Sequence, residues 1–154
     1  MTNSNSSPQP VALLNALTEL VDVVAQLRSP AGGCPWDLAQ TPDSLIPYVI
    51  EEAYETVDAI RSGQPTAICE ELGDLLLQVV LQAQIASEAG HFSLQDVAQG
   101  ISAKLIRRHP HVFGDVKVET IAELHQNWEQ IKALEKGEDP ATPKPLSQTL
   151  SRYA

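Results

Sequence analysis

Residues 71–89, ELGDLLLQVVLQAQIASEA, decide the fold of this chain. Drawn as a helix at about 100° per residue, the segment carries apolar side chains around nearly its whole circumference. The helix is expected to open at Pro65 or Thr66 and to run through Ala89, where Gly90 closes it. A helix that is apolar all round is a buried helix. The segment therefore predicts an all-α protein with this helix at its centre.

Four further helices are predicted from apolar side chains at helical spacing and from signals at the helix ends. Asp43 or Ser44 is expected to cap the helix that precedes the central one, and Ser93 with Asp96 resembles a capping box for the helix that follows it. The four cover about residues 11–27, 44–61, 93–109 and 120–136. The expected architecture is a bundle of about five helices whose core is completed by oligomerisation.

Length and charge limit the classes of function that are open to the chain. Its 154 residues suit one globular domain, predicted at 11–137 between a disordered tail at 1–10 and a Pro-rich tail at 138–154. The net charge of −10 argues against binding to a nucleic acid polymer, which needs a basic face. A small anion can still be bound where a metal ion inverts the local charge.

The sequence favours a cytoplasmic location. The N-terminus lacks the basic and apolar regions of a signal peptide, and Cys34 and Cys69 match no metal-ligand spacing. The longest apolar run, near residues 75–81, is interrupted by Gln78 and is too short to span a membrane. We therefore expect a soluble protein with both cysteines as thiols.

Two pairs of acidic residues stand out because of where they fall on their helices. Glu52 and Glu55 lie one turn apart along the border of an apolar stripe, and Glu71 and Asp74 lie one turn apart inside the central helix. Burying an ionised carboxylate without a partner is expensive, and the central helix carries no Lys or Arg. A shared cation resolves this cost, and ligands that are all oxygen select Mg²⁺, Mn²⁺ or Ca²⁺ over Zn²⁺. The alternative is that these acids are ordinary solvated side chains or complement a helix dipole.

A basic cluster supplies the opposite charge. Lys104, Arg107 and Arg108 share one helical face, and such side chains bind phosphate oxygens. They could equally complement the dipole at the end of their own helix. Trp128 on the last helix fits either core packing or stacking on a nucleobase. Carboxylates that hold Mg²⁺ opposite a basic cluster would suit a polyphosphate substrate.

Three segments together resemble the MazG family of nucleoside triphosphate pyrophosphohydrolases. They are CPWDLAQTPDSLIPYVIEEAYETVDAI at 34–60, EELGDLLLQVVLQAQIA at 70–86 and KLIRRHPHVFGD at 104–115. The family's core motif, EExxE followed by ExxD, is here Glu51-Glu52-x-x-Glu55 and Glu71-x-x-Asp74. The resemblance runs from about Leu13 to Lys136, and the chain is similar to the first domain of family members that have two.

The resemblance implies an all-α enzyme that hydrolyses NTPs or dNTPs to the monophosphate and pyrophosphate, as in house-cleaning of the nucleotide pool. It implies homodimers or homotetramers, and Mg²⁺, with Mn²⁺ as a possible substitute. The implied metal ligands are Glu52, Glu55, Glu71 and Asp74. The implied nucleotide contacts are Lys104, Arg107, Arg108 and Trp128, and Glu51 or Glu52 would orient the attacking water.

Two other classes of function remain open on the sequence. One is a helical module that binds or senses nucleotides without hydrolysing them. The other is an oxidative bundle with two metal ions, which the lack of His on the two acidic helices disfavours.

Overall fold

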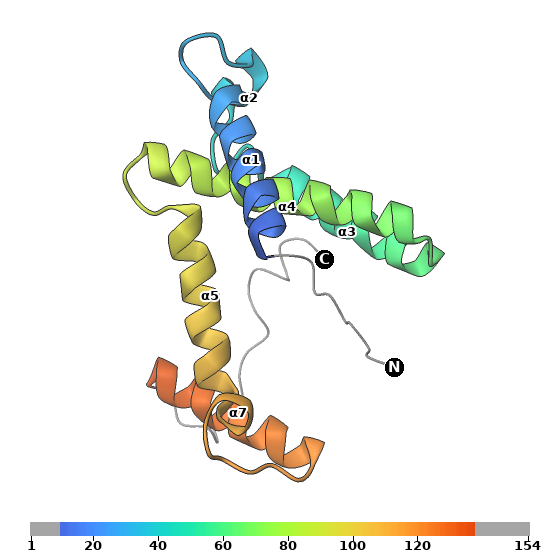
Figure 1. Ribbon diagram of the computed structural model, residues 1–154, viewed down its shortest axis with the longest axis vertical. Coiled ribbons are helices and arrows are strands. Elements are labelled where there is room, and N and C mark those ends of the chain that lie inside the picture. The colour runs from blue at the N-terminus through green and yellow to red at the C-terminus, as the bar shows by residue number, and fades with distance from the viewer. Residues whose placement is uncertain (1–9, 138–154) are drawn as a thin grey trace. The chain divides into compact units, whose positions relative to one another are not determined.

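The computed structural model describes residues 10–137, and within them every regular element is a helix (Figure 1). The all-α prediction is therefore confirmed. The helices are α1 (Pro10–Leu27), α2 (Pro35–Ala39), α3 (Ile46–Ser62), α4 (Pro65–Glu88), α5 (Leu94–Arg108), α6 (Pro110–Phe113) and α7 (Ile121–Lys136). The five long ones match the five expected, whereas the short α2 and α6 were not expected.

The chain forms two compact units, the first ending at Val97 and the second beginning at Ala98. The boundary falls inside α5, so the domain predicted at 11–137 comprises parts of both units. The predicted tails lie outside the described residues, except for Pro10, which is the first residue of α1.

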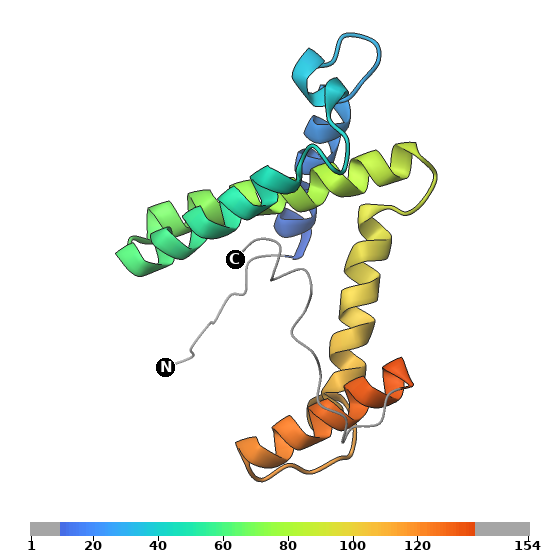
Figure 2. The same ribbon diagram turned by 180° about the vertical axis from the view of Figure 1, so that it is seen from behind.

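An antiparallel pair of helices, α3 and α4, forms the frame of the first unit (Figures 1 and 2). The turn between them is tight because Gly63 adopts a φ of 69°, a left-handed conformation that glycine tolerates. Pro65 then starts α4, at a position where its missing N–H costs nothing. This hairpin brings the two predicted pairs of acids onto adjacent helices.

The core of the first unit lies where α1 packs across the second half of α4. Its fully buried side chains include Leu45, just before α3, and Val24 of α1. The buried cluster consists of Val24, Leu45, Val80, Leu81 and Ile85, with Leu20, Val21, Tyr48, Leu77 and Leu94 packed against it.

Arg28 fastens the segment that carries α2 to this core. Its guanidinium forms an ion pair with Glu88 at 2.6 Å and also donates to the carbonyl oxygens of Asp37 and Gln40. At the same segment, the ring of Trp36 meets that of Tyr48 edge-on at 5.6 Å between centroids. The loop after α1 is thus held by one buried cation and an aromatic contact.

The expectation that α4 is buried all round is wrong for its first half in this chain. Leu72 and Leu76 expose 49% and 39% of their surface, because α1 and α3 cover only part of the helix. In the second half Val79 is also exposed, whereas the apolar side chains of Val80, Leu81, Ala83, Ile85 and Ala86 are buried as expected. Apolar surface of this extent on one helix is typical of surfaces that a partner covers.

The predicted cap at the start of α5 is confirmed, whereas the one predicted for α3 is not. The Ser93 N–H donates to the Asp96 carboxylate at 2.8 Å, which is the expected capping box. Neither Asp43 nor Ser44 caps α3, because Leu45 takes that position and Ser44 instead exchanges hydrogen bonds with Thr41 at 2.8 and 3.1 Å.

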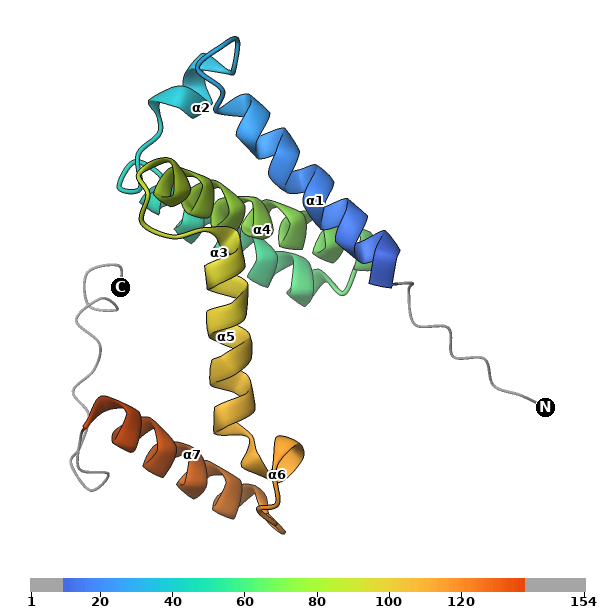
Figure 3. The same cartoon turned by 60° about the vertical axis from the view of Figure 1, so that its left-hand side comes forward.

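In the second unit, α7 follows α6 and a connecting segment (Figure 3). Thr120 caps α7 by accepting from the N–H of Glu123 at 3.2 Å, and Gly137 ends it with a φ of 65°. Trp128 of α7 donates from Nε1 to the carbonyl oxygen of Arg108 at 2.7 Å. This bond ties α7 to the end of α5.

Helix α1 is long and apolar enough to cross a membrane by length and composition alone, which the sequence analysis did not expect of any segment. Its 18 residues have a mean hydropathy of 1.4. However, its face with Leu20, Val21 and Val24 packs against α4 in the core. Only 6% of the helix is buried, so this packing accounts for one face of α1 and leaves most of its apolar side chains exposed.

Candidate functional site

Three carboxylates converge between α3 and α4. Glu52 and Glu55 project from α3 and Glu71 projects from α4, and each has an oxygen within 4.8 Å of an oxygen of the other two. Glu52 and Glu71 are half-buried, whereas Glu55 is exposed. Within the described range, no Lys, Arg or His side chain forms an ion pair with any of the three. We call these three residues the acidic cluster.

A buried hydroxyl fixes the two helices together at the acidic cluster. Thr56 lies one turn after Glu52, and its Oγ1 donates to the carbonyl oxygen of Glu52 at 2.7 Å. The same hydroxyl lies 3.3 Å from the carbonyl oxygen of Glu71 on the facing helix. Because the two backbone carbonyls meet at one small side chain, the glutamates that carry them are held close together.

The acidic cluster is electrostatically unfavourable without a cation. Partial burial, followed by repulsion from Asp74 and Glu55, raises the pKa of Glu52 above its ordinary value. Partial burial, followed by repulsion from Glu55 and Asp74, raises the pKa of Glu71. Both shifts have the direction that is expected when carboxylates share a site and no positive charge offsets them.

The other two predicted acidic residues lie beside the acidic cluster. Asp74 is exposed and stands outside the group of three, but its charge acts on both Glu52 and Glu71. Glu51 is exposed on α3, and its charge also raises the pKa of Glu52. The structure thus brings together three of the four expected metal ligands and places the fourth within electrostatic reach.

The chemistry of this donor set fits a hard divalent cation. It offers carboxylate oxygens alone, as Mg²⁺, Mn²⁺ and Ca²⁺ prefer, and no sulfur or imidazole nitrogen that would favour Zn²⁺. Helix bundles form metal sites in this way, from acids on facing helices. A cation here would also relieve the repulsion that raises the two pKa values.

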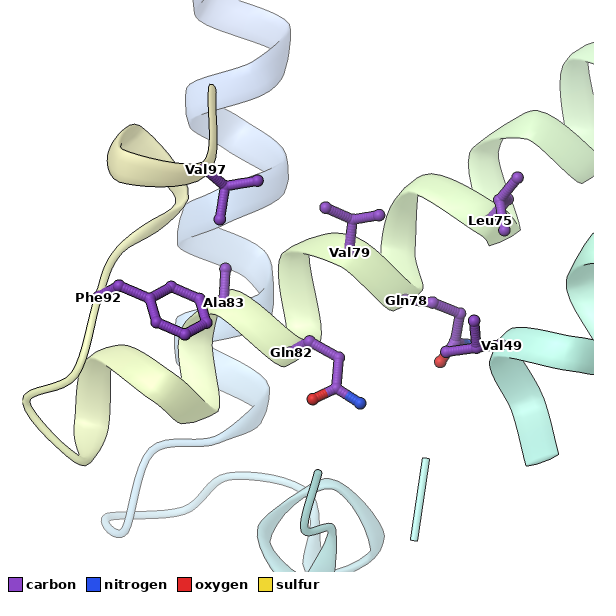
Figure 4. A pocket seen from close by; sticks show the side chains of 8 residues that line it. All are labelled: Val49, Leu75, Gln78, Val79, Gln82, Ala83, Phe92 and Val97. Carbon is purple, nitrogen blue, oxygen red and sulfur yellow. The ribbon is translucent and has the colours of Figure 1, made fainter. Parts of the chain in front are cut away.

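An apolar cavity of about 300 Å³ lies on the same pair of helices (Figure 4). Val49 lines it from α3 and precedes Glu52 by one turn, while Gln78 lines it from α4 and follows Asp74 by one turn. The lining side chains are Val49, Leu75, Gln78, Val79, Gln82, Ala83, Phe92 and Val97. The cavity is therefore close to the acids along both helices.

The predicted phosphate-binding residues lie in the second unit, where two of the three are already paired. Arg107 and Arg108 both bind the carboxylate of Glu135, at 2.5 and 2.7 Å. The two arginines hold the pKa of Glu135 down to about 2. Lys104 is exposed on the same helix.

Trp128 packs among histidines in this second unit. Its ring meets those of His109 and His125 edge-on, with centroids 5.1 and 6.4 Å away. Since its N–H is bonded to the carbonyl oxygen of Arg108, Trp128 has a packing role within the unit. Its predicted contact with a nucleotide remains a prediction.

Sequence reasoning missed four residues that shape these regions. Thr56 and Gln78 follow Glu52 and Asp74 by four residues, a spacing that could have identified them. Arg28 and Glu135 could not have been found in this way, because their partners lie 60 and 27 to 28 residues away in the chain.

Comparison with known proteins gives the same family as the motif. Residues 40–113 match the family described as MazG nucleotide pyrophosphohydrolase domain. Over 119 residues the chain is 53% identical to the nucleoside triphosphate pyrophosphohydrolase/pyrophosphatase MazG of Thermotoga maritima, covering 77% of this chain and 45% of that protein. Over 125 residues it is 46% identical to the nucleoside triphosphate pyrophosphohydrolase of Escherichia coli K12, covering 81% and 48%. The chain thus spans about half the length of these relatives.

A solved structure agrees with the fold. The crystal structure of a mazG-related protein from Thermotoga maritima superposes with a TM-score of 0.62 at 24% identity, covering 75% of this chain and 97% of that one. At this identity the likeness supports the fold alone. Family membership follows from the sequence. The matched domain includes all the residues of the acidic cluster, and the sequence relatives are named as pyrophosphohydrolases, so the chain belongs to the MazG nucleotide pyrophosphohydrolase family.

Proposed function

We propose that this protein hydrolyses (d)NTPs to (d)NMP and pyrophosphate in a Mg²⁺-dependent reaction. The observation that carries the proposal is the acidic cluster, in which carboxylates from α3 and α4 lie within 4.8 Å of one another without a counter-ion among the described residues. Carboxylates grouped in this way can hold a divalent cation, which in turn binds a polyphosphate substrate. The names of the relatives indicate the class of reaction.

Glu52, Glu55, Glu71 and Asp74 would hold the metal. When bound, the ion would neutralise phosphate charge and lower the pKa of a coordinated water. Glu52 is half-buried within the acidic cluster, so it, or its exposed neighbour Glu51, is placed to orient a water and accept its proton. That water attacks the α-phosphorus, the bond from this phosphorus to the bridging oxygen breaks, and pyrophosphate leaves.

Lys104, Arg107 and Arg108 would bind the phosphates, and Trp128 would lie near the nucleotide. For the two arginines this requires an exchange, because both now bind Glu135. A triphosphate carries more charge than one carboxylate and accepts several charge-assisted hydrogen bonds. It is therefore able to compete for the arginines.

Pyrophosphate release from the eight standard (d)NTPs with MgCl₂ tests the proposal. Release from at least one of them that is lost in Glu52→Gln and retained in Asp58→Asn is the expected result. Asp58 is a matched control because it lies on the same helix, is exposed and pairs with Arg61. Equal rates in the Glu52→Gln variant and the wild-type protein would refute the assignment of the site.

A nucleotide-binding module without catalysis is the second candidate. It is favoured by the pairing of Arg107 and Arg108 with Glu135, which leaves less positive charge for a transition state. The products separate the two candidates. Monophosphate with pyrophosphate supports the enzyme, diphosphate with phosphate indicates another type of NTPase, and intact bound nucleotide supports the module.

We further propose a cytoplasmic homodimer or homotetramer that acts in house-cleaning of the nucleotide pool. The exposed apolar side chains of Leu72, Leu76 and Val79 on α4 support the assembly, because a second copy could bury them. Light scattering of the full chain, compared with a Leu72→Glu variant, tests it. An equal mass at or near that of a monomer for both proteins would argue against the assembly.

A further inference from the structure

Glu135 occupies the two arginines that are proposed to bind phosphate. Its carboxylate accepts from Nε of Arg107 at 2.5 Å and from Nη2 of Arg108 at 2.7 Å, so it bridges two guanidinium groups. Arg108 also donates from Nε to this carboxylate at 3.2 Å, in the fork geometry that arginine uses for phosphate groups as well. The two arginines lower the pKa of Glu135 to about 2, so its carboxylate is ionised at neutral pH. Glu135 therefore takes the donors that a phosphate group would need.

The place of Glu135 on its helix allows this contact to open. Glu135 lies in the last turn of α7, two residues before Gly137 ends the helix. The ends of helices unfold locally at a much lower cost than their interiors. Trp128, two turns earlier on the same face, ties α7 to the carbonyl oxygen of Arg108 by a separate hydrogen bond. The release of Glu135 would therefore leave the rest of α7 in place.

Part of the basic surface can receive a ligand while Glu135 is still bound. Arg107 donates to Glu135 through Nε alone, and its Nη groups form no hydrogen bond with any residue from 10 to 137. The side chain of Arg107 is 52% exposed, compared with 24% for Arg108 and 19% for Glu135. Lys104, one turn earlier on α5, is exposed as well. A polyphosphate can thus bind to these outer donors first and then displace the carboxylate.

We infer, on the basis of the proposed function, that Glu135 is an autoinhibitory side chain that competes with the phosphates of the nucleotide for Arg107 and Arg108. In the closed state Glu135 holds both arginines, and in the open state the arginines bind phosphate. A ligand that needs the open state has its apparent affinity reduced in proportion to the fraction of molecules that are open. The contact therefore weakens the binding of the substrate and of the pyrophosphate product alike.

Replacement of Glu135 by glutamine tests the competition. The amide keeps the shape of the side chain and lacks its negative charge, so the closed state loses stability. The dissociation constant of added pyrophosphate, measured by calorimetry on the full chain in MgCl₂, should fall about fivefold in Glu135→Gln. Glu123→Gln is the matched control and should change it less than about twofold. Glu123 lies in the first turn of the same helix, where its carboxylate accepts from the N–H of Glu119 at 2.9 Å.

A double-mutant cycle separates competition from a general change in charge. When Arg107 and Arg108 are both replaced by glutamine, Glu135 has no arginine to occupy, so adding Glu135→Gln should change the dissociation constant less than about twofold. A gain of the same size with and without the arginines would overturn the inference. An unchanged or weaker affinity in Glu135→Gln alone would overturn it too, because that result is expected if Glu135 only positions the arginines or stabilises the fold. Partial loss of folding cannot produce tighter binding.

The failure of the proposed function can be told apart from the failure of this inference, because the binding of added pyrophosphate requires no hydrolysis. If the wild-type protein releases no pyrophosphate from any (d)NTP, but Glu135→Gln binds added pyrophosphate more tightly through the arginines, the function is wrong and the competition is right. If the wild-type protein hydrolyses (d)NTPs and Glu135→Gln binds pyrophosphate no more tightly, the function is right and the competition is wrong.

Discussion

Two charged clusters in this protein differ in how their charge is offset. In the first unit, the acidic cluster brings three carboxylates within 4.8 Å of one another and raises the pKa of Glu52 and Glu71. In the second unit, Arg107 and Arg108 enclose Glu135 and lower its pKa to about 2. Charge that is offset within the chain stabilises the fold, whereas charge that is not offset prepares a binding site.

The largest expected effect is a loss of activity when a carboxylate of the acidic cluster is replaced. Glu55→Gln removes one predicted metal ligand from an exposed position and should lower the rate of pyrophosphate release at least about 100-fold. Asp58→Asn, one turn further along α3, should have little effect because Asp58 pairs with Arg61 outside the cluster. Steady-state assays at saturating Mg²⁺ measure both. Similar rates of pyrophosphate release in the two variants would show that the acidic cluster is no more important for activity than an acid outside it.

A second effect concerns the offset charge of Arg28. Its side chain is 8% exposed, and it binds Glu88 as well as two backbone carbonyls, so Arg28→Met leaves Glu88 without a counter-ion and the loop before α3 without its hydrogen bonds to residue 28. We expect a loss of roughly 2 kcal/mol in the free energy of unfolding. Urea denaturation measures it. An equally stable variant would show that this ion pair does not hold the loop.

The long helices and the acidic motif could be predicted from the sequence, because both depend on the spacing of residues that are close together in the chain. Gly63, Gly90 and Gly137 end helices with positive φ, and Ser93 pairs with Asp96 three residues later. Interactions between distant residues could not be predicted. Neither the pairing of Arg28 with Glu88 nor that of Arg108 with Glu135 leaves a pattern in the chain.

The errors at α3 and α4 have physical causes as well. Ser44 was expected as a cap, but the burial of Leu45 shifts the start of the helix and leaves Ser44 to pair with Thr41. The apolar pattern of α4 correctly predicts a buried second half, whereas α1 and α3 do not cover Leu72 and Leu76. A single sequence does not say which of its apolar faces its own chain covers.

A smaller effect is expected at Thr56, which helps to position the acidic cluster. Thr56→Val keeps the shape of the buried side chain but removes the hydroxyl that lies between the carbonyls of Glu52 and Glu71. We expect a loss of about 1 kcal/mol in the free energy of unfolding and a weaker affinity for Mg²⁺. Thermal denaturation and calorimetry measure the two quantities. Thr66→Val, at an exposed position in the first turn of α4, is the control.

The smallest effect is the pH dependence at Glu135. Because its folded pKa of about 2 lies below the ordinary 4.5, the pair contributes stability above pH 4.5 and loses it as the pH falls towards about 2. Glu135→Gln should therefore be less stable than the wild-type protein at pH 7, by a modest amount since the arginines are partly exposed. The difference should close in acid. A constant difference across this range would mean that the ion pair is not its source.

The acidic cluster is electrostatically strained until a divalent cation occupies it. The most direct measurement is the melting temperature of the wild-type protein and of Glu71→Gln, each in EDTA and in MgCl₂ at pH 7.5. Glu71 has a raised pKa, so in EDTA its ionisation costs stability and the variant should melt higher. In MgCl₂ the order should reverse, because the wild-type protein binds the ion more tightly. The same order of melting temperatures in both buffers would contradict the account.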